Sequence, residues 1–187
     1  MPVRLVTPRR FGDARGWFAE TWSRARYATL GIDPEFVQDN HSFSAETGTL
    51  RGLHWQAPPF AQAKLVRCVR GRIWDVAVDV RAGSPSYGRW VGAELSAETG
   101  TQIFVPVGFA HGFVTLEPDC EVEYKVSAPY DQASEGGLRW DDPTLALPWP
   151  LPPGGPALSE KDAVLPLLND LDTPFAYDGA PLVPLEP

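Results

Sequence analysis

The sequence predicts a mainly β protein, folded as an antiparallel sandwich or barrel with a few short helices. Three observations support this fold class. Segments typical of β-strands recur through the middle of the 187-residue chain. In one of them, large apolar residues occupy every second position from Trp74 to Val80. Turn residues separate these segments at short intervals, as in all-β sandwiches and barrels. Helix signals are few by comparison.

The central segment "KLVRCVRGRIWDVAVDVR" predicts two strands joined at Arg70-Gly71-Arg72. The second strand has two distinct faces, since alternate side chains of a strand point to opposite sides of a sheet. One face carries Trp74, Val76, Val78 and Val80, and the other carries Ile73, Asp75, Ala77 and Asp79. Further strands are expected over Gly88 to Leu95, Gln102 to Pro106, Gly112 to Leu116 and Glu121 to Val126.

Two short helices are expected. The first spans Ser23 to Leu30, with Ser23 as N-cap and Gly31 as its stop signal. The second spans Ser159 to Leu168, with Ser159 as N-cap and Asp162 at the third helical position, a weak capping box. Pro166 limits the regularity of this second helix.

The chain is expected to form a single domain over residues 1–187. Eleven of its 20 prolines lie from Pro143 onward. The segment from about residue 143 is therefore expected to be irregular and packed across the surface, rather than to form a second domain.

Composition excludes several classes of function. Hydrophobic residues make up 43% of the chain and charged residues 21%, which is typical of a globular protein. A net charge of −8 argues against binding to nucleic acid or to an anionic membrane surface. No stretch approaches the roughly 18 apolar residues of a membrane span, and the N-terminus lacks the apolar run of a signal peptide. With only two cysteines, Cys68 and Cys120, a cytoplasmic protein is the expectation.

Several catalytic motifs are absent from the sequence. It contains no GxxxxGK phosphate loop, no GxGxxG fingerprint, no HExxH, no CxxC and no GxSxG elbow. Nucleoside triphosphate chemistry and dinucleotide-dependent redox chemistry are therefore disfavoured.

Two of the three histidines lie in segments of interest. His111 ends a PxGxxH pattern in "PVGFAHGF", which resembles the second motif of cupin barrels. The first motif of metal-binding cupins usually holds an HxH pair, but here it reads His54-Trp55-Gln56. A three-histidine site would need His41, so neither a metal nor another cofactor is expected. A metal-dependent cupin oxygenase or isomerase is kept as the alternative from another class.

If the histidines are not ligands, they can act as acid–base groups. His54 could accept a proton from carbon if a carboxylate orients it. Lys64 could stabilise an oxyanion beside that carbon, and Tyr124 could return a proton from the opposite face. Such a set could racemise a carbon next to a ketone. Taken singly, each has a plainer interpretation: a hydrogen-bonded strand histidine, a solvated lysine, a core tyrosine.

Ten short motifs occur in order along the chain: "DARGWFAE", "FVQDNHSFS", "LRGLHWQ", "AQAKLVR", "GRIWDVAVDVR", "GSPSYGRW", "PVGFAHGF", "EYK", "RWDDP" and "LSEKD". Together they resemble the dTDP-4-dehydrorhamnose 3,5-epimerase family of cupin-type sugar-nucleotide epimerases. The resemblance runs from about Asp13 to Leu168, and the tail beyond Asn169 matches nothing. It implies a cupin-like double-stranded β-helix, or jelly-roll, barrel that needs no cofactor.

The resemblance also assigns roles to individual residues. His54 matches the base that removes protons at C3 and C5 of a 4-keto sugar, and Asp162 the carboxylate that pairs with it. Lys64 matches the residue near the enolate, and Tyr124 the acid on the other face. Tyr130 matches an aromatic residue that stacks on thymine. The remaining matches hold the nucleotide and its diphosphate: Arg15, Glu20, Gln38, Asn40, Arg51, His111, Glu135 and Lys161.

Arg15 and Glu20 reach the site from a partner subunit in the family, so the resemblance implies a homodimer. Pro129, just before Tyr130, departs from the aromatic residue of many relatives. The expected activity is epimerisation of dTDP-4-dehydro-6-deoxy-D-glucose at C3 and C5 to dTDP-4-dehydro-L-rhamnose. An epimerase acting at only one of these carbons and a non-catalytic nucleotide-sugar binding module remain as alternatives.

Overall fold

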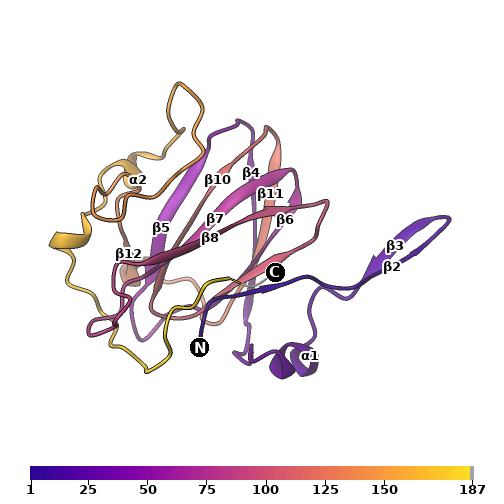
Figure 1. Ribbon diagram of the computed structural model, residues 1–187, viewed down its shortest axis with the longest axis horizontal. Helices are drawn as coiled ribbons and strands as arrows, with labels where there is room; N and C mark the ends of the chain where they lie inside the picture. Colours follow the sequence, from indigo (N-terminus) through magenta and orange to yellow (C-terminus); the bar gives the residue numbers. More distant parts are fainter. Residues whose placement is uncertain (186–187) are drawn as a thin grey trace.

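The computed structural model describes residues 1–185 and consists mainly of two facing antiparallel sheets, with a separate hairpin projecting from them (Figure 1). The first sheet has the spatial order β1 (Arg4–Val6), β9 (Gln102–Val105), β6 (Lys64–Arg70), β11 (Cys120–Val126) and β4 (Gln38–Ser44). The second has the order β12 (Glu135–Gly137), β5 (Leu50–Gln56), β10 (Phe109–Thr115), β7 (Arg72–Asp79) and β8 (Trp90–Ser96). The expected mainly β, cupin-like jelly-roll class is confirmed.

The two faces of β7 divide as the alternation predicted. Ile73 and Ala77 belong to the apolar core between the sheets, together with Val66 and Val122 of the first sheet. Val76 and Val78 belong to a second core on the outer side of the second sheet. Because both faces of β7 are buried, Asp75 and Asp79 are fully enclosed as well. A carboxylate in such a place needs specific partners.

Each outer core is covered by segments from outside the sheets. The C-terminal segment covers the second sheet, where Phe175 packs edge-on against Trp55 with ring centroids 6.4 Å apart. Tyr27 of α1 (Arg24–Thr29) and Ile32 cover part of the first sheet, over Leu65 and Phe104.

The predicted helices differ in outcome. Helix α1 begins after Ser23, as expected, although the Ser23 side chain makes no capping hydrogen bond. Helix α2 spans only Glu160–Ala163, so the expected extension to Leu168 is wrong, and Pro166 lies in the part that is not helical. Ser159 caps α2 by accepting a hydrogen bond from the Asp162 backbone N–H at 3.1 Å. Two single-turn 3₁₀ helices complete the structure, η1 (Gln132–Ser134) and η2 (Leu168–Asp170).

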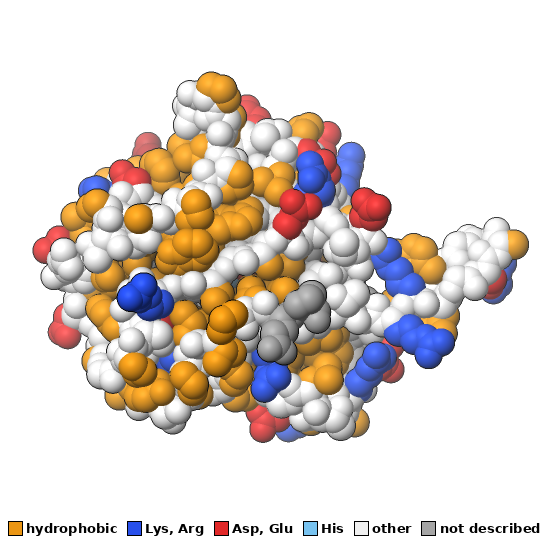
Figure 2. Space-filling model, in the orientation of Figure 1, with side chains coloured by type: hydrophobic (Ala, Val, Ile, Leu, Met, Phe, Trp, Pro, Cys, Tyr) orange, Lys and Arg blue, Asp and Glu red, His pale blue; other side chains and the backbone are white. Residues whose placement is uncertain are grey.

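The β2 (Arg10–Asp13) and β3 (Gly16–Ala19) hairpin projects away from the barrel (Figures 1 and 2). We call this hairpin the arm. It exposes large apolar side chains, with Trp17 at 59% and Phe18 at 70% relative accessibility. Exposed aromatic residues in such numbers are typical of a surface that contacts another molecule.

The C-terminal segment packs on the barrel, with Leu168 and Phe175 in the outer core of the second sheet. Arg81, buried beside Asp79 of β7, pairs with Asp178 at 2.6 Å. Asp178 in turn pairs with the N-terminal ammonium of Met1 at 3.2 Å. Met1 and Asp178 of the C-terminal segment therefore lie at the same part of the barrel. None of the helices within residues 1–185 is long and apolar enough to cross a membrane.

Candidate active site

A cavity of about 500 Å³ extends into the barrel and is bordered by α2 and the segment before it. Alternate side chains of a strand point to opposite sides of a sheet. In β5, Leu53 and Trp55 belong to the outer core, so His54 between them points into the barrel. In β6, Lys64 points to the same side as Val66 of the core between the sheets, so both polar side chains enter an otherwise apolar interior. Seven of the sequence-predicted site residues line this cavity: Arg51, His54, Lys64, His111, Tyr124, Lys161 and Asp162.

His54 and Asp162 form a hydrogen-bonded pair. The His54 Nε2–Asp162 Oδ1 distance is 2.6 Å, and only 5% of the Asp162 side chain is exposed. Burial acts to raise the pKa of Asp162, but hydrogen bonds from His54 and from the Gly52 N–H outweigh it, and the pKa lies below its usual range. A carboxylate can only accept, so Nε2 carries a proton. The other ring nitrogen of neutral His54 is then free to act as a base.

Lys64 lies deep in the same cavity. Its Nζ donates a hydrogen bond to the His54 carbonyl oxygen at 3.3 Å, so it sits beside the base. Burial lowers the pKa of Lys64 to about 8, although the carboxylates of Asp75 and Glu135 oppose this shift. An ammonium group held in an enclosed site can stabilise an oxyanion strongly.

Tyr124 enters the cavity from the opposite sheet. It lies on β11 of the first sheet, whereas His54 lies on β5 of the second. Burial raises the pKa of Tyr124, with Arg51 opposing part of the shift. The phenol is therefore protonated near neutral pH and can donate a proton. A base and an acid on opposite walls can act on opposite faces of a molecule bound between them.

Two cations line the mouth of the cavity. Arg51 donates hydrogen bonds to Ser44 Oγ and to the Phe43 carbonyl, and within residues 1–185 no carboxylate lies at ion-pair distance from its guanidinium. Lys161 pairs with Glu135 at 2.5 Å on the exposed rim. Arg51 therefore has the uncompensated charge that a diphosphate would need.

A smaller cavity of about 140 Å³ adjoins the first, since both include His54, Lys64 and Tyr124. It brings in the other predicted binding residues of the barrel, Gln38, Asn40, Tyr130 and Glu135. Gln38 donates to Asn40 Oδ1 at 2.8 Å and accepts from the Tyr130 backbone N–H at 3.0 Å. The exposed ring of Tyr130 stands at the edge of the site.

Gln56, the residue in place of a cupin metal ligand, fixes the loop that carries Tyr130. Its amide nitrogen donates to the carbonyls of Phe60 and Pro129, at 2.7 and 3.1 Å, and its oxygen accepts from the Asp131 N–H at 2.9 Å. Pro129 is thus a fixed point of the loop through its carbonyl group. Sequence reasoning noted Gln56 only as a missing ligand.

Arg15 and Glu20 do not reach either cavity within one chain. Arg15 lies in the turn of the arm, 89% exposed, and pairs with Asp13 at 2.5 Å. Glu20 follows β3 and lies 3.8 Å from Arg26. Their predicted role in binding therefore depends on a partner subunit.

Sequence reasoning gave no role to Asp75. Its two carboxylate oxygens lie 3.0 and 2.9 Å from His111 Nε2, and Asp75 is fully buried. The signal was present in the strand pattern, because Asp75 shares a face with Ile73 and Ala77, which proved to be the interior face.

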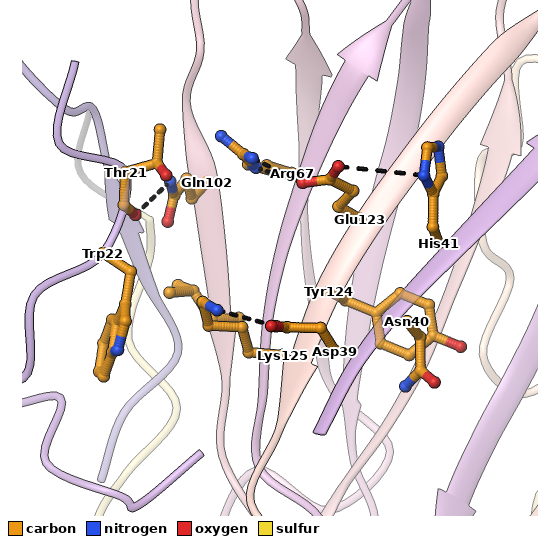
Figure 3. A pocket seen from close by; sticks show the side chains of 11 residues that line it. Thr21, Trp22, Asp39, Asn40, His41, Arg67, Gln102, Glu123, Tyr124 and Lys125 are labelled. Atoms are coloured by element: carbon orange, nitrogen blue, oxygen red, sulfur yellow. Dashed lines mark hydrogen bonds and ion pairs between the residues drawn. The ribbon is translucent and has the colours of Figure 1, made fainter. Parts of the chain in front are cut away.

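A further cavity, of about 480 Å³, lies against the outer face of the first sheet (Figure 3). Its charged side chains pair among themselves: Arg67 with Glu123 at 2.5 Å and Lys125 with Asp39 at 2.8 Å. His41 lies on this outer face, 2.9 Å from Glu121. It therefore does not converge with His54 and His111. Within residues 1–185, no three His, Cys, Asp or Glu side chains group as metal ligands would.

Comparison with known proteins assigns the chain to a family. Residues 2–170 match the family model described as dTDP-4-dehydrorhamnose 3,5-epimerase. A relative of that name from Sinorhizobium fredii is 54% identical, over 94% of this chain and 89% of its own. The Bacillus anthracis enzyme of that name, solved with TDP and PPi bound, superposes with a TM-score of 0.84 at 50% identity, covering 87% and 92% of the two chains.

The Legionella pneumophila dTDP-6-deoxy-D-glucose-3,5-epimerase, solved with dTDP-4-keto-L-rhamnose, has a TM-score of 0.86 at 46% identity, covering 90% of this chain and 88% of its own. The same fold also serves a 3'-monoepimerase from Streptomyces bikiniensis, with a TM-score of 0.83 at 34% identity over 89% and 84% of the chains. The family model matches most of this chain, and relatives of the same name are about 50% identical to it in sequence. This chain therefore belongs to the dTDP-4-dehydrorhamnose 3,5-epimerase family.

Proposed function

We propose that this chain converts dTDP-4-dehydro-6-deoxy-D-glucose to dTDP-4-dehydro-L-rhamnose by inverting C3 and C5. The observation that supports this best is the convergence of His54, Asp162, Lys64 and Tyr124 on one cavity. C3 and C5 both flank the C4 ketone, so proton loss from either carbon gives an enolate on the same oxygen. One base, one oxyanion partner and one acid therefore suffice for both inversions.

Each inversion proceeds in two steps. His54 takes the proton from carbon, and the electrons of the broken C–H bond pass into the enolate at O4, next to the Lys64 ammonium. Tyr124 then donates its phenolic proton to the opposite face of the same carbon. The His54 imidazolium and the Tyr124 phenolate return to their starting states by proton exchange with water. Asp162 stabilises the imidazolium while it exists.

Arg51 and Lys161 are assigned to the diphosphate, and Tyr130 to stacking on thymine. Gln38, Asn40, Glu135 and His111 complete the binding set. The location of these side chains around two adjoining cavities supports the assignment. Arg51→Ala should weaken dTDP binding by calorimetry, while an equivalent change of Arg67, on the outer face, should not.

A single-carbon epimerase is the second candidate, because the Streptomyces monoepimerase has the same fold. The higher identity to 3,5-epimerases, 54% against 34%, favours inversion at both carbons. Incubation with the 4-keto nucleotide sugar in deuterated water, followed by NMR, separates the two. Deuterium at C3 and C5 supports the proposal, and deuterium at one carbon alone refutes it.

The active form is proposed to be a homodimer in which the arm of one chain brings Arg15 and Glu20 to the site of the other. The support is the exposed aromatic surface of the arm and the distance of both residues from their own cavity. Light scattering should give twice the mass of 20.5 kDa. An active monomer would refute the arrangement.

The proposed location is the cytoplasm. Its support is the buried, unpaired state of Cys68 and Cys120. Cell fractionation with an antibody to the chain would test it, and recovery with the membrane or secreted fraction would contradict it.

A further inference from the structure

Asp75 is a fully buried carboxylate that the mechanism above does not use, and it contacts His111, which lines the epimerase cavity. It lies on β7 and reaches the site through His111 of β10, whose partner in the β7–β10 ladder is Ala77, two residues along β7 from Asp75. Both Asp75 oxygens contact the same nitrogen, His111 Nε2, at 3.0 and 2.9 Å. A carboxylate held away from water in this way keeps its charge only if cations offset the loss of hydration.

The first consequence concerns His111. With Asp75 as acceptor, the proton of the ring lies on Nε2, and Nδ1 is the nitrogen left for a bound molecule. The same hydrogen bond limits rotation of the ring about its χ2 angle. The orientation of His111 toward the cavity is thus set from behind by β7.

The second consequence concerns Lys64. Burial lowers its pKa to about 8, and Asp75 is the first of two carboxylates that oppose this shift, the other being Glu135. The effect is mutual: burial raises the pKa of Asp75 above its usual value, and His111 and Lys64 oppose part of this rise. Lys64 and His111 are therefore the two groups that favour the charged form of this carboxyl.

We propose that Asp75 is a positioning residue of this site, which holds His111 through Nε2 and places a buried carboxyl behind the cavity wall that His111 shares with Lys64. The inference rests on the proposed function, because it names the support of two residues of that mechanism. Asp75 itself is not required to touch the substrate.

A pH effect must be weighed against every ionisable group near Lys64. Those that line the two cavities with Lys64 are Arg51 and His54 (β5), His111 (β10), Tyr124 (β11), Tyr130, Glu135 (β12), and Lys161 and Asp162 (α2), and Asp75 (β7) lies behind His111. Asp75 and Glu135 are the two carboxylates that act on Lys64. Glu135 is partly satisfied by Lys161 at 2.5 Å, and it lies at the exposed rim. Asp75 is the enclosed one, so its charge is screened least.

The chain offers a direct measurement, since it has only three lysines: Lys64, Lys125 and Lys161. Protein labelled with ¹³Cε-lysine gives three signals, which Lys125→Arg and Lys161→Arg variants assign. Asp75→Asn keeps the volume and the hydrogen-bond acceptor but removes the charge. It should move the titration midpoint of Lys64 down by about one pH unit, the lower end for a close opposite charge.

The enzymatic readout follows from the same shift. A midpoint one unit lower reduces the ammonium fraction about tenfold at pH values above both midpoints. The kcat/KM of Asp75→Asn should therefore fall about tenfold more, relative to wild type, at pH 9 than at pH 6. A purely structural defect would lower activity by a similar factor at all pH values.

Asp79→Asn is the matched control, because Asp79 is also fully buried on β7 but pairs with Arg81, outside the cavity. It should lower the melting temperature and leave the Lys64 midpoint unchanged. If Asp75→Asn does not fold, Asp75→Ser removes the same charge with a smaller side chain and should show the same shift.

An unchanged Lys64 midpoint in a folded, uncharged Asp75 variant would overturn the inference, as would equal shifts in the Asp75 and Asp79 variants. Failure of the wild-type enzyme to exchange deuterium into the sugar would instead refute the proposed function. The NMR titration would still report on Asp75 in that case, so the two failures are distinguishable.

Discussion

Replacing His54 with asparagine removes the proposed base. The asparagine amide is shorter than the imidazole, so Asp162 loses the hydrogen bond that it accepts from His54 Nε2 at 2.6 Å. The amide cannot accept a proton from carbon near neutral pH. The Gly52 N–H, 3.4 Å from Asp162 Oδ2, remains as a partner of the buried carboxylate.

The magnitude follows from the role. A positioned acid–base group contributes typically about 10²–10⁴-fold in rate, or about 3–5 kcal/mol of barrier. Turnover of His54→Asn should fall by at least that order. Because one base serves both carbons, deuterium incorporation should fall at C3 and C5 together. Affinity for dTDP should stay within about threefold, since Arg51 and Tyr130 are untouched.

His41→Asn is the matched control. His41 also contacts a carboxylate, Glu121 at 2.9 Å, but it lies on the outer face of the first sheet. A surface change of this kind costs about 0.5 kcal/mol or less, so turnover should stay within about twofold. The assay is NMR of the nucleotide sugar in deuterated water, with dTDP affinity from calorimetry. Deuterium exchange at both carbons of His54→Asn near the wild-type rate would mean that another group is the base.

Three other outcomes are expected. Tyr124→Phe removes the acid and keeps the base, so deuterium exchange from the retained face should continue while inversion falls by about 10²-fold or more; equal loss of both would contradict the separate roles. The Lys64 ammonium is present below its pKa of about 8 and lost above it, so kcat/KM of the wild type should decline above about pH 8, and a flat profile to pH 10 would refute its electrostatic role. Exhaustive chelation should leave activity intact; loss with EDTA and recovery with one divalent metal would establish the metal-dependent alternative.

The sequence pattern predicted β7 and also β6 and β11, which carry Lys64 and Tyr124 of the site, but it did not predict β4. β7 could be identified as a strand because apolar residues occupy both of its faces, each of which packs in an apolar core. β4, "QDNHSFS", was not identified as a strand from periodicity. Its inward residues Gln38 and Asn40 line the smaller cavity, and its outward residues Asp39 and His41 are exposed. A strand that serves a polar cavity loses the hydrophobic signal that would reveal it.

The arm was missed for a related reason. Its strands have four residues each, and their aromatic side chains are exposed in the single chain, so neither length nor burial marks them. The site itself was predicted from motif resemblance, which named the residues but not their supports. Asp75 and Gln56 act on His111 and on the Tyr130 loop through hydrogen bonds between distant segments, and such contacts become visible only in three dimensions.

The ion pair between Met1 and Asp178 bears on how the protein could be re-engineered. The Met1 ammonium lies 3.2 Å from Asp178, only seven residues before the last described residue, Leu185. The first residue and this late segment of the chain therefore lie close together, as circular permutation requires. A short glycine-rich linker could join them, with new ends opened at the exposed Gly154, where a side chain added to the glycine would meet no atom within 4 Å beyond its chain neighbours. In such a permutant, fusion tags would be attached at the new ends near Gly154 and not beside Asp178. The Arg81–Asp178 ion pair would then lie next to a continuous loop.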